Sequence, residues 1–103
     1  MSHLYTLLVG GVVRPGGGAP EASSIAWAAD TVLMIGTVDS VRAISRGDSH
    51  EVDIAGMTVV PLGETLEIGG PANLKVLDAN SRTVAVVLGG QVVEGALVGA
   101  EHR

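Results

Sequence analysis

The sequence predicts an all-β protein, a small antiparallel β-sandwich or barrel with one short helix. Apolar runs rich in valine recur along the chain, and the branched valine side chain packs well on a pleated sheet. Turns that contain glycine or proline separate these runs at close spacing, as in all-β sandwiches. The 103 residues include 15 glycines and no phenylalanine, so the core has to be built mainly from aliphatic side chains. This length is that of one small domain, which we expect to span residues 1–103.

The first half of the chain is expected to hold most of the strands and the only helix. Gly10-Gly11 should bend the first strand, and a turn at Ala29-Asp30 should join two strands into a hairpin. Residues 15–22 are expected to form a flexible loop, because dense glycine and proline disfavour regular structure. Residues 39–45 have helix character, with Asp39 or Ser40 as the cap and apolar residues three apart on one face. The expected strands cover residues 4–9, 12–14, 24–28, 31–36, 51–54 and 57–60.

The second half is expected to be strands alone. Pro61 should end the preceding strand, since proline cannot donate to a sheet ladder. Gly89-Gly90 is typical of a two-residue hairpin turn. The expected strands are residues 65–68, 74–78, 84–88 and 91–94, followed by a short strand and fraying residues over 96–103.

Charge and composition exclude several classes of partner. The net charge is −5, and the six basic residues are scattered without a basic stripe, which argues against nucleic acid and anionic membranes. The uncharged stretch 83–93 is too short to cross a bilayer as a helix, and no basic segment introduces residues 4–13 as a signal peptide would require. The absence of cysteine excludes disulfides and thiolate metal sites. We therefore expect a cytoplasmic protein with neither nucleic acid nor membrane as partner.

Two groups of segments, in a fixed order, carry a family resemblance. Residues 7–13 are Leu-Leu-Val-Gly-Gly-Val-Val, the expected hairpin at 25–36 ends in Ile-Gly, and residues 52–61 are Val-Asp-Ile-Ala-Gly-Met-Thr-Val-Val-Pro. Residues 66–78 are Leu-Glu-Ile-Gly-Gly-Pro-Ala-Asn-Leu-Lys-Val-Leu-Asp, and another hairpin follows over 86–93. These segments resemble the two chain ends of metal-dependent amidohydrolases of the imidazolonepropionase and dihydroorotase-like kind. The resemblance implies their composite β-sandwich domain, which in that family flanks a catalytic TIM-like barrel.

The departures from the family pattern concern its chemistry. In the family a His-x-His metal motif follows the proline that corresponds to Pro61, whereas here the chain continues with Glu64-Thr65-Leu66-Glu67. The family's aspartate after Ala72 is Asn73, and its Asp-Gly turn is Ala29-Asp30. The catalytic barrel that should lie between the two groups of segments is missing. The resemblance therefore implies the sandwich fold and not the hydrolase activity.

The residues themselves predict no catalytic, cofactor-binding or metal-binding site. A catalytic zinc ion needs about three protein ligands, and His3, His50 and His102 form neither a His-x-His nor a His-x-x-x-His pair. Carboxylate pairs are possible at Glu51 with Asp53 and at Glu64 with Glu67, but a solvated face is the favoured interpretation.

The remaining polar and aromatic candidates have structural interpretations. Ser23, Ser24 and Ser45 lack a Gly-x-Ser-x-Gly elbow and are expected in turns or caps. Residues 16–18 are three glycines without the Gly-Lys-Ser/Thr of a phosphate loop. Asp78 is expected to cap a turn. Trp27 is expected either in the core or at an interface.

The implied loss of a barrel leads to an expectation about association. Without the barrel, an apolar side of the sandwich would face water, and large apolar patches are rarely exposed on soluble monomers. We therefore expect a homo-oligomer, most simply a symmetric dimer, or a complex with another protein. Three functions stay open: a non-catalytic stand-alone sandwich that acts through protein association, an accessory subunit of a split amidohydrolase acting on C–N bonds, and a small-molecule binding module.

Overall fold

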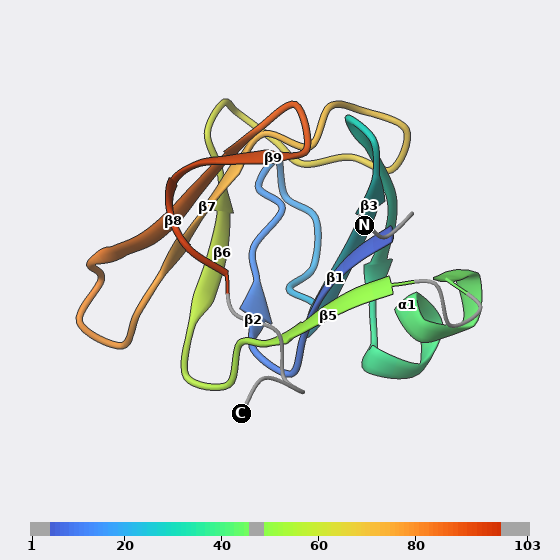
Figure 1. Ribbon diagram of the computed structural model, residues 1–103, viewed down its shortest axis with the longest axis horizontal. Helices are drawn as coiled ribbons and strands as arrows, with labels where there is room; N and C mark the ends of the chain where they lie inside the picture. The colour runs from blue at the N-terminus through green and yellow to red at the C-terminus, as the bar shows by residue number, and fades with distance from the viewer. Residues whose placement is uncertain (1–4, 46–48, 98–103) are drawn as a thin grey trace.

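Two β-sheets pack face to face in the computed structural model, which describes residues 5–45 and 49–97 (Figure 1). One sheet has four strands in the order β4 (Thr31–Gly36), β3 (Ser24–Ala28), β1 (Tyr5–Val9) and β5 (Ser49–Asp53). The other has five, in the order β2 (Val12–Val13), β6 (Thr58–Pro61), β7 (Leu74–Leu77), β8 (Thr83–Leu88) and β9 (Gln91–Gly95). The prediction of an all-β sandwich is confirmed.

Strand pairing is antiparallel with two exceptions, so the expectation of an antiparallel sandwich needs amendment. β1 pairs with β5 in parallel, and β2 pairs with β6 in parallel. The two parallel pairs have one cause, because β1 continues into β2 and β5 continues into β6. A bend at Gly10-Gly11 joins β1 to β2 and a turn at Ala55-Gly56 joins β5 to β6, so the two segments pass together through a corner from one sheet to the other.

The corner at Gly10-Gly11 confirms the predicted bend. The amide of Gly11 donates to the carbonyl of Ser23 at 3.1 Å, and the amide of Ile54 donates to the carbonyl of Val9 at 2.9 Å. A Cβ atom on Gly11 would lie 2.4 Å from the carbonyl oxygen of Ile54. Glycine is needed here because the two backbones approach too closely for any side chain.

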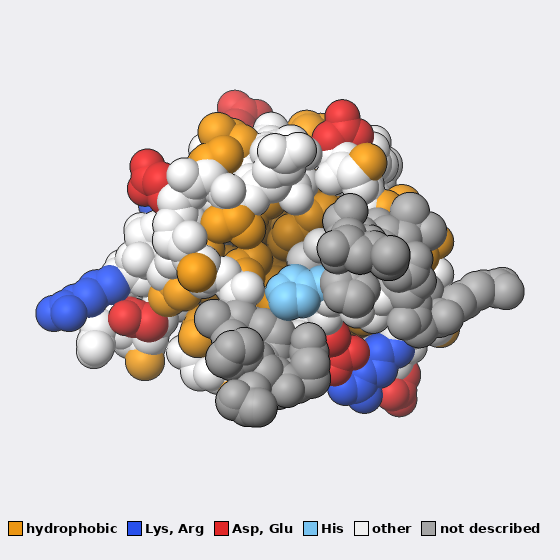
Figure 2. Space-filling model, viewed as in Figure 1, with side chains coloured by type: hydrophobic (Ala, Val, Ile, Leu, Met, Phe, Trp, Pro, Cys, Tyr) orange, Lys and Arg blue, Asp and Glu red, His pale blue; other side chains and the backbone are white. Residues whose placement is uncertain are grey.

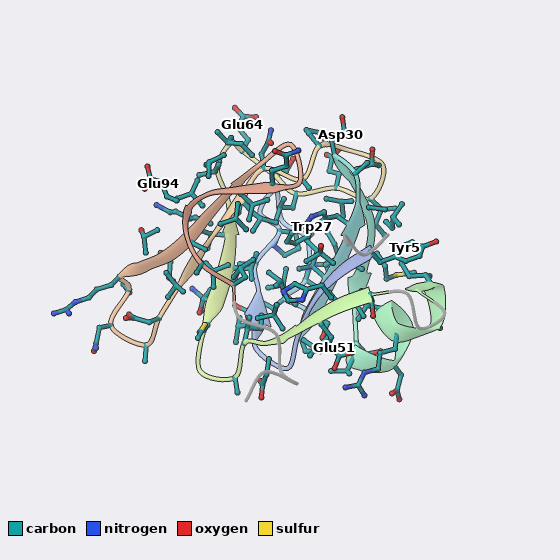
Figure 3. The ribbon with its side chains drawn as sticks, viewed as in Figure 1. Tyr5, Trp27, Asp30, Glu51, Glu64 and Glu94 are labelled. Atoms are coloured by element: carbon teal, nitrogen blue, oxygen red, sulfur yellow. The ribbon has the colours of Figure 1, made fainter. Side chains whose placement is uncertain are left out.

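The core lies between the sheets and includes Trp27, which settles the choice left open by the sequence. Trp27 is 2% exposed, and its indole Nε1 donates to the carbonyl of Gly90 at 3.0 Å. Figure 3 shows the ring between the sheets. Aliphatic side chains surround it, among them Leu8, Ile25, Val32, Val59, Leu74, Val76 and Val87.

The helix α1 (Val38–Ser45) covers the outer face of the four-stranded sheet. Val41 packs there against Leu7, Val9 and Ala26. The prediction of Asp39 or Ser40 as the cap is wrong, because Thr37 occupies that position. Thr37 Oγ1 accepts from the amide of Ser40 at 3.1 Å, while Ser40 Oγ accepts from the amide of Thr37 at 2.9 Å. This reciprocal pair is a capping box.

A long loop between β6 and β7 crosses the end of the sandwich (Figure 1). The strand predicted over residues 65–68 is absent from this loop. The amide of Leu66 donates to the carbonyl of Pro15, and the amide of Gly70 turns back to the carbonyl of Glu67. The loop then reaches β4, where the amide of Val32 donates to Gly70.

Two further expectations concern irregular segments. Residues 15–22 form an irregular loop, and at its end Ala22 forms an isolated antiparallel bridge with Val13. The strand expected from residue 96 onward lies largely outside the described residues, which end at Leu97. Within the described ranges, no helix has the length and apolarity needed to cross a membrane.

Candidate functional site

The histidines do not gather in the described part of the chain. His50 lies on β5, and its Nε2 is 3.5 Å from the carbonyl oxygen of Leu97. His3 and His102 lie outside the described residues. Over residues 5–45 and 49–97, no three His, Cys, Asp or Glu side chains are arranged to hold a metal ion.

Glu51 and Asp53 both have structural partners. The guanidinium of Arg42 on α1 donates two hydrogen bonds to the carboxylate of Glu51, at 3.0 and 2.6 Å. The hydrogen bond from Arg42 and its positive charge hold the pKa of Glu51 below its usual range, while partial burial opposes this shift. The same contact raises the pKa of Arg42. Asp53 Oδ1 accepts from the amide of Ala55 at 2.9 Å, so each carboxylate serves a separate local contact.

The other acidic residues are spread over separate loops and strands. Figure 3 shows Asp30, Glu64 and Glu94 pointing outward from different elements. Asp78 Oδ1 accepts from the amides of Asn80 and Arg82 at 2.8 and 3.0 Å, which confirms its predicted role in a turn.

Ser23 and Ser24 stabilise the corner between the sheets. Ser24 is fully buried, and its hydroxyl oxygen accepts from the amide of Gly10 at 3.3 Å. The hydroxyl of Ser23 donates to the carbonyl of Gly36 at 3.3 Å. Both hydroxyls make structural contacts, although Ser24 lies in β3 and not in a turn or cap. The side chain of Ser45 lies outside the described part of the structure.

The outer face of the five-stranded sheet bears on the expectation that an apolar side of the sandwich faces water, although the sequence did not predict which residues form it. Val60 pairs with Lys75 and Lys75 with Val86, and the neighbouring row on these strands is buried in the core. Because side chains alternate along a strand, Val60, Lys75 and Val86 face outward. Leu88 lies two residues beyond Val86 on the same side and is 50% exposed. We call the side chains of Val60, Lys75, Leu77, Val86 and Leu88 the outer face.

The outer faces of the two sheets differ in what covers them. α1 packs against β1, β3 and β4 of the four-stranded sheet. No helix in the described residues covers the other outer face. Two charged side chains lie on it, Lys75 and Glu94, because Glu94 pairs with Val86 and faces the same way, and neither forms an ion pair within the described residues. A ladder of aliphatic side chains therefore remains in contact with solvent in this part of the chain.

A groove of about 450 Å³ opens between three segments on another side of the molecule. It is bounded by the loop 15–22, by the end of β4 and by residues 66–68. Leu66 is only 3% exposed, whereas Ile68 at the edge is 60% exposed. The lining is apolar except for Glu21 and Glu67. No residue pattern predicted this groove, because it depends on how two loops far apart in the chain come together.

Figure 2 shows a face on which hydrophobic side chains gather at the centre and charged ones lie around the periphery. A cavity of about 190 Å³ is lined by Val52, Met57, Val84 and Leu97, among others. The cavity lies between β5 and the residues that follow β9.

The comparison with known proteins shows a similarity of fold and no membership of a family. The sequence matches no protein-family model and no curated protein. Among solved structures, an uncharacterized metal-dependent hydrolase from Pyrococcus furiosus is similar to this chain, with a TM-score of 0.51 and 19% sequence identity. The similarity covers 55% of this chain and 13% of that protein. More than half of the chain is thus similar in fold to a small part of a metal-dependent hydrolase.

Proposed function

We propose that this protein is a non-catalytic module that acts through protein association, with the outer face of the five-stranded sheet as its contact surface. The observation that carries the proposal is the difference between the two sheets. The outer face of one sheet is covered by α1, whereas the other keeps Leu77, Val86 and Leu88 at positions that face outward.

The composition of this outer face favours a partner over solvent. In an antiparallel sheet with one solvent-exposed face, apolar residues on the inner face normally alternate with polar residues on the outer face. Here the outward row runs from Val60 through Lys75 and Val86 to Glu94, and Leu77 and Leu88 lie beside it on the same face. Removing a methylene group from water contributes about 0.8 kcal/mol, so several covered aliphatic side chains would offset the cost of association. A second copy packed about a two-fold axis is the simplest arrangement.

The experiment is light scattering coupled to size-exclusion chromatography, run over a concentration series up to about 1 mM. The wild type should have twice the chain mass of 10.4 kDa at high concentration. Leu88→Lys should shift the protein to the monomer, because it places a charge on the outer face. Ile68→Lys is the matched control, since Ile68 is also exposed but lies at the groove. A wild type that stays monomeric at about 1 mM would refute self-association through this surface.

A second function is favoured by one specific observation. The similar hydrolase is matched over only 13% of its length, so most of such an enzyme would have to be supplied by another chain. This chain would then be the accessory subunit of a split metal-dependent hydrolase acting on C–N bonds. Affinity purification from the native host, with mass spectrometry and metal analysis, tests this alternative. Recovery of a metal-containing barrel protein with a His-x-His motif would support it, and purification of this chain without such a protein would contradict it.

A further inference from the structure

The groove lies where β4 loses its neighbour. β4 is the edge strand of the four-stranded sheet, with β3 on one side. At its beginning the other side is occupied, because the amide of Val32 donates to Gly70 at 2.9 Å and the carbonyl of Val32 accepts from Gly69 at 2.7 Å. Beyond Val32 the loop diverges, and no described residue forms a backbone hydrogen bond with that side of β4. Ile35 and Gly36 instead border the groove.

An unpaired strand edge is a template for another strand. Natural proteins usually protect such an edge with lysine, proline or a covering segment. The open stretch of β4 is Leu33-Met34-Ile35-Gly36, which contains neither charge nor proline, and the register with β3 shifts only at its first residue, Leu33. Four extended residues span about 13 Å, enough for a short peptide to pair along them.

The chemistry of the groove limits what such a peptide can be. Pro15, Ala22, Ile35 and Leu66 give an apolar lining that suits an aliphatic side chain. No lysine or arginine lines the groove, while two carboxylates do. Glu21 is already paired with Arg14 at 2.8 Å, but the contact of Glu67 is a long hydrogen bond of 3.4 Å from Thr65. A basic residue beside the aliphatic one would therefore complement Glu67.

We propose that this groove binds an extended peptide segment of another protein, which adds as a strand to the open edge of β4. An aliphatic side chain of the peptide enters the groove, and a lysine or arginine two residues away, on the same face of the added strand, pairs with Glu67. The groove volume of about 450 Å³ lies within the range of roughly 300–1,000 Å³ typical of ligand sites. This site is separate from the outer face of the five-stranded sheet, so it does not depend on the proposed association through that face.

The test is an NMR titration of the full ¹⁵N-labelled chain with acetyl-Lys-Thr-Val-Thr-Lys-amide, in which the valine and both lysines share one face when the peptide is extended. Two further peptides are titrated for comparison: one with glutamate in place of both lysines, and one with a methylated amide nitrogen at valine. We expect chemical-shift changes at residues 33–36 and 66–68. We also expect at least about tenfold weaker binding of the acidic peptide, because of charge repulsion, and of the methylated peptide, because of lost backbone pairing.

Variants of the protein locate the contact. Glu67→Lys should lower the affinity for the basic peptide about tenfold and raise the affinity for the acidic peptide. Glu94→Lys is the matched control, because it makes the same charge change on β9 and should alter neither affinity. Leu88→Lys should bind the peptide as the wild type does, which separates this test from that of the association surface.

Three outcomes would overturn the proposal. The first is the absence of shift changes at the groove at about 5 mM of the basic peptide. The second is undiminished binding of the methylated peptide, which would mean that the groove binds its side chains without pairing of its backbone with β4. The third is shift changes confined to β9, which would place strand addition on the other sheet.

Discussion

Replacing Gly11 by alanine tests whether the corner between the sheets depends on close backbone contact. The new Cβ atom would lie 2.4 Å from the carbonyl oxygen of Ile54 and 2.8 Å from two of its side-chain carbons. Carbon atoms pack best at about 3.5–4.0 Å, so the two strands would have to separate by at least about 0.7 Å. Ile54 is fully buried and bonded to Val9, which prevents it from moving aside alone.

The expected cost combines overpacking with weakened hydrogen bonds. Overpacking of this kind costs about 1–3 kcal/mol, and one weakened backbone hydrogen bond adds about 1 kcal/mol. We therefore expect Gly11→Ala to lower the free energy of unfolding by about 2–4 kcal/mol. For a domain of this size, this lowers Tm by roughly 10–25 °C.

Circular dichroism during urea and thermal unfolding measures the change. Gly63→Ala is the matched control, because a Cβ atom on Gly63 would meet nothing within 4 Å. This control should stay within about 0.5 kcal/mol of the wild type. If Gly11→Ala is as stable as Gly63→Ala, the close approach at the corner does not constrain the fold and the reasoning is refuted.

Three further predictions follow from other contacts. Trp27→Phe should lower the free energy of unfolding by about 2–4 kcal/mol in urea, because it leaves a cavity and deprives the Gly90 carbonyl of its donor; an unchanged midpoint would contradict this. Thr37→Ala should cost about 1 kcal/mol of unfolding free energy, measured in the same way, whereas Thr37→Ser should retain the cap. Glu51→Gln should cost about 0.5–1 kcal/mol at pH 7, since it removes the charge that Arg42 pairs with. Because the pKa of Glu51 is lowered in the folded state, its contribution is present above about pH 4.3 and is lost as the pH falls further, so the two proteins should converge in acid.

The sequence predicted the elements of the fold well where local chemistry decides them. Gly89-Gly90 forms its hairpin turn with positive φ at both residues, as two-residue turns require. Asp78 occupies the expected turn, and Gly10-Gly11 the expected bend. The helix cap lies two or three residues before the predicted one, because Thr37 Oγ1 accepts from the amide of Ser40.

Features that depend on distant segments were not predictable from local patterns. The loop at 65–68 alternates like a strand, but Leu66 is buried by contact with the distant Pro15 loop and has no strand beside it. The parallel pairs arise from two strands that are far apart in the chain. The groove and the outer face depend on the same long-range arrangement. An apolar side exposed to water was expected, but no residue pattern indicated which residues form it, and none indicated the groove.

The shared corner has a consequence for how the chain folds. Tyr5 pairs with Ser49 at the start of the β1–β5 ladder, so this contact closes a long stretch of chain that includes β3, β4 and α1. Contacts between residues so distant in sequence are slow to form, and sandwiches dominated by them fold in about milliseconds to seconds. Since both continuous strands belong to both sheets, neither sheet can assemble to completion before the other. We expect the molecule to fold and unfold as one cooperative unit, with slow-exchanging amide protons in both sheets that share a common opening free energy.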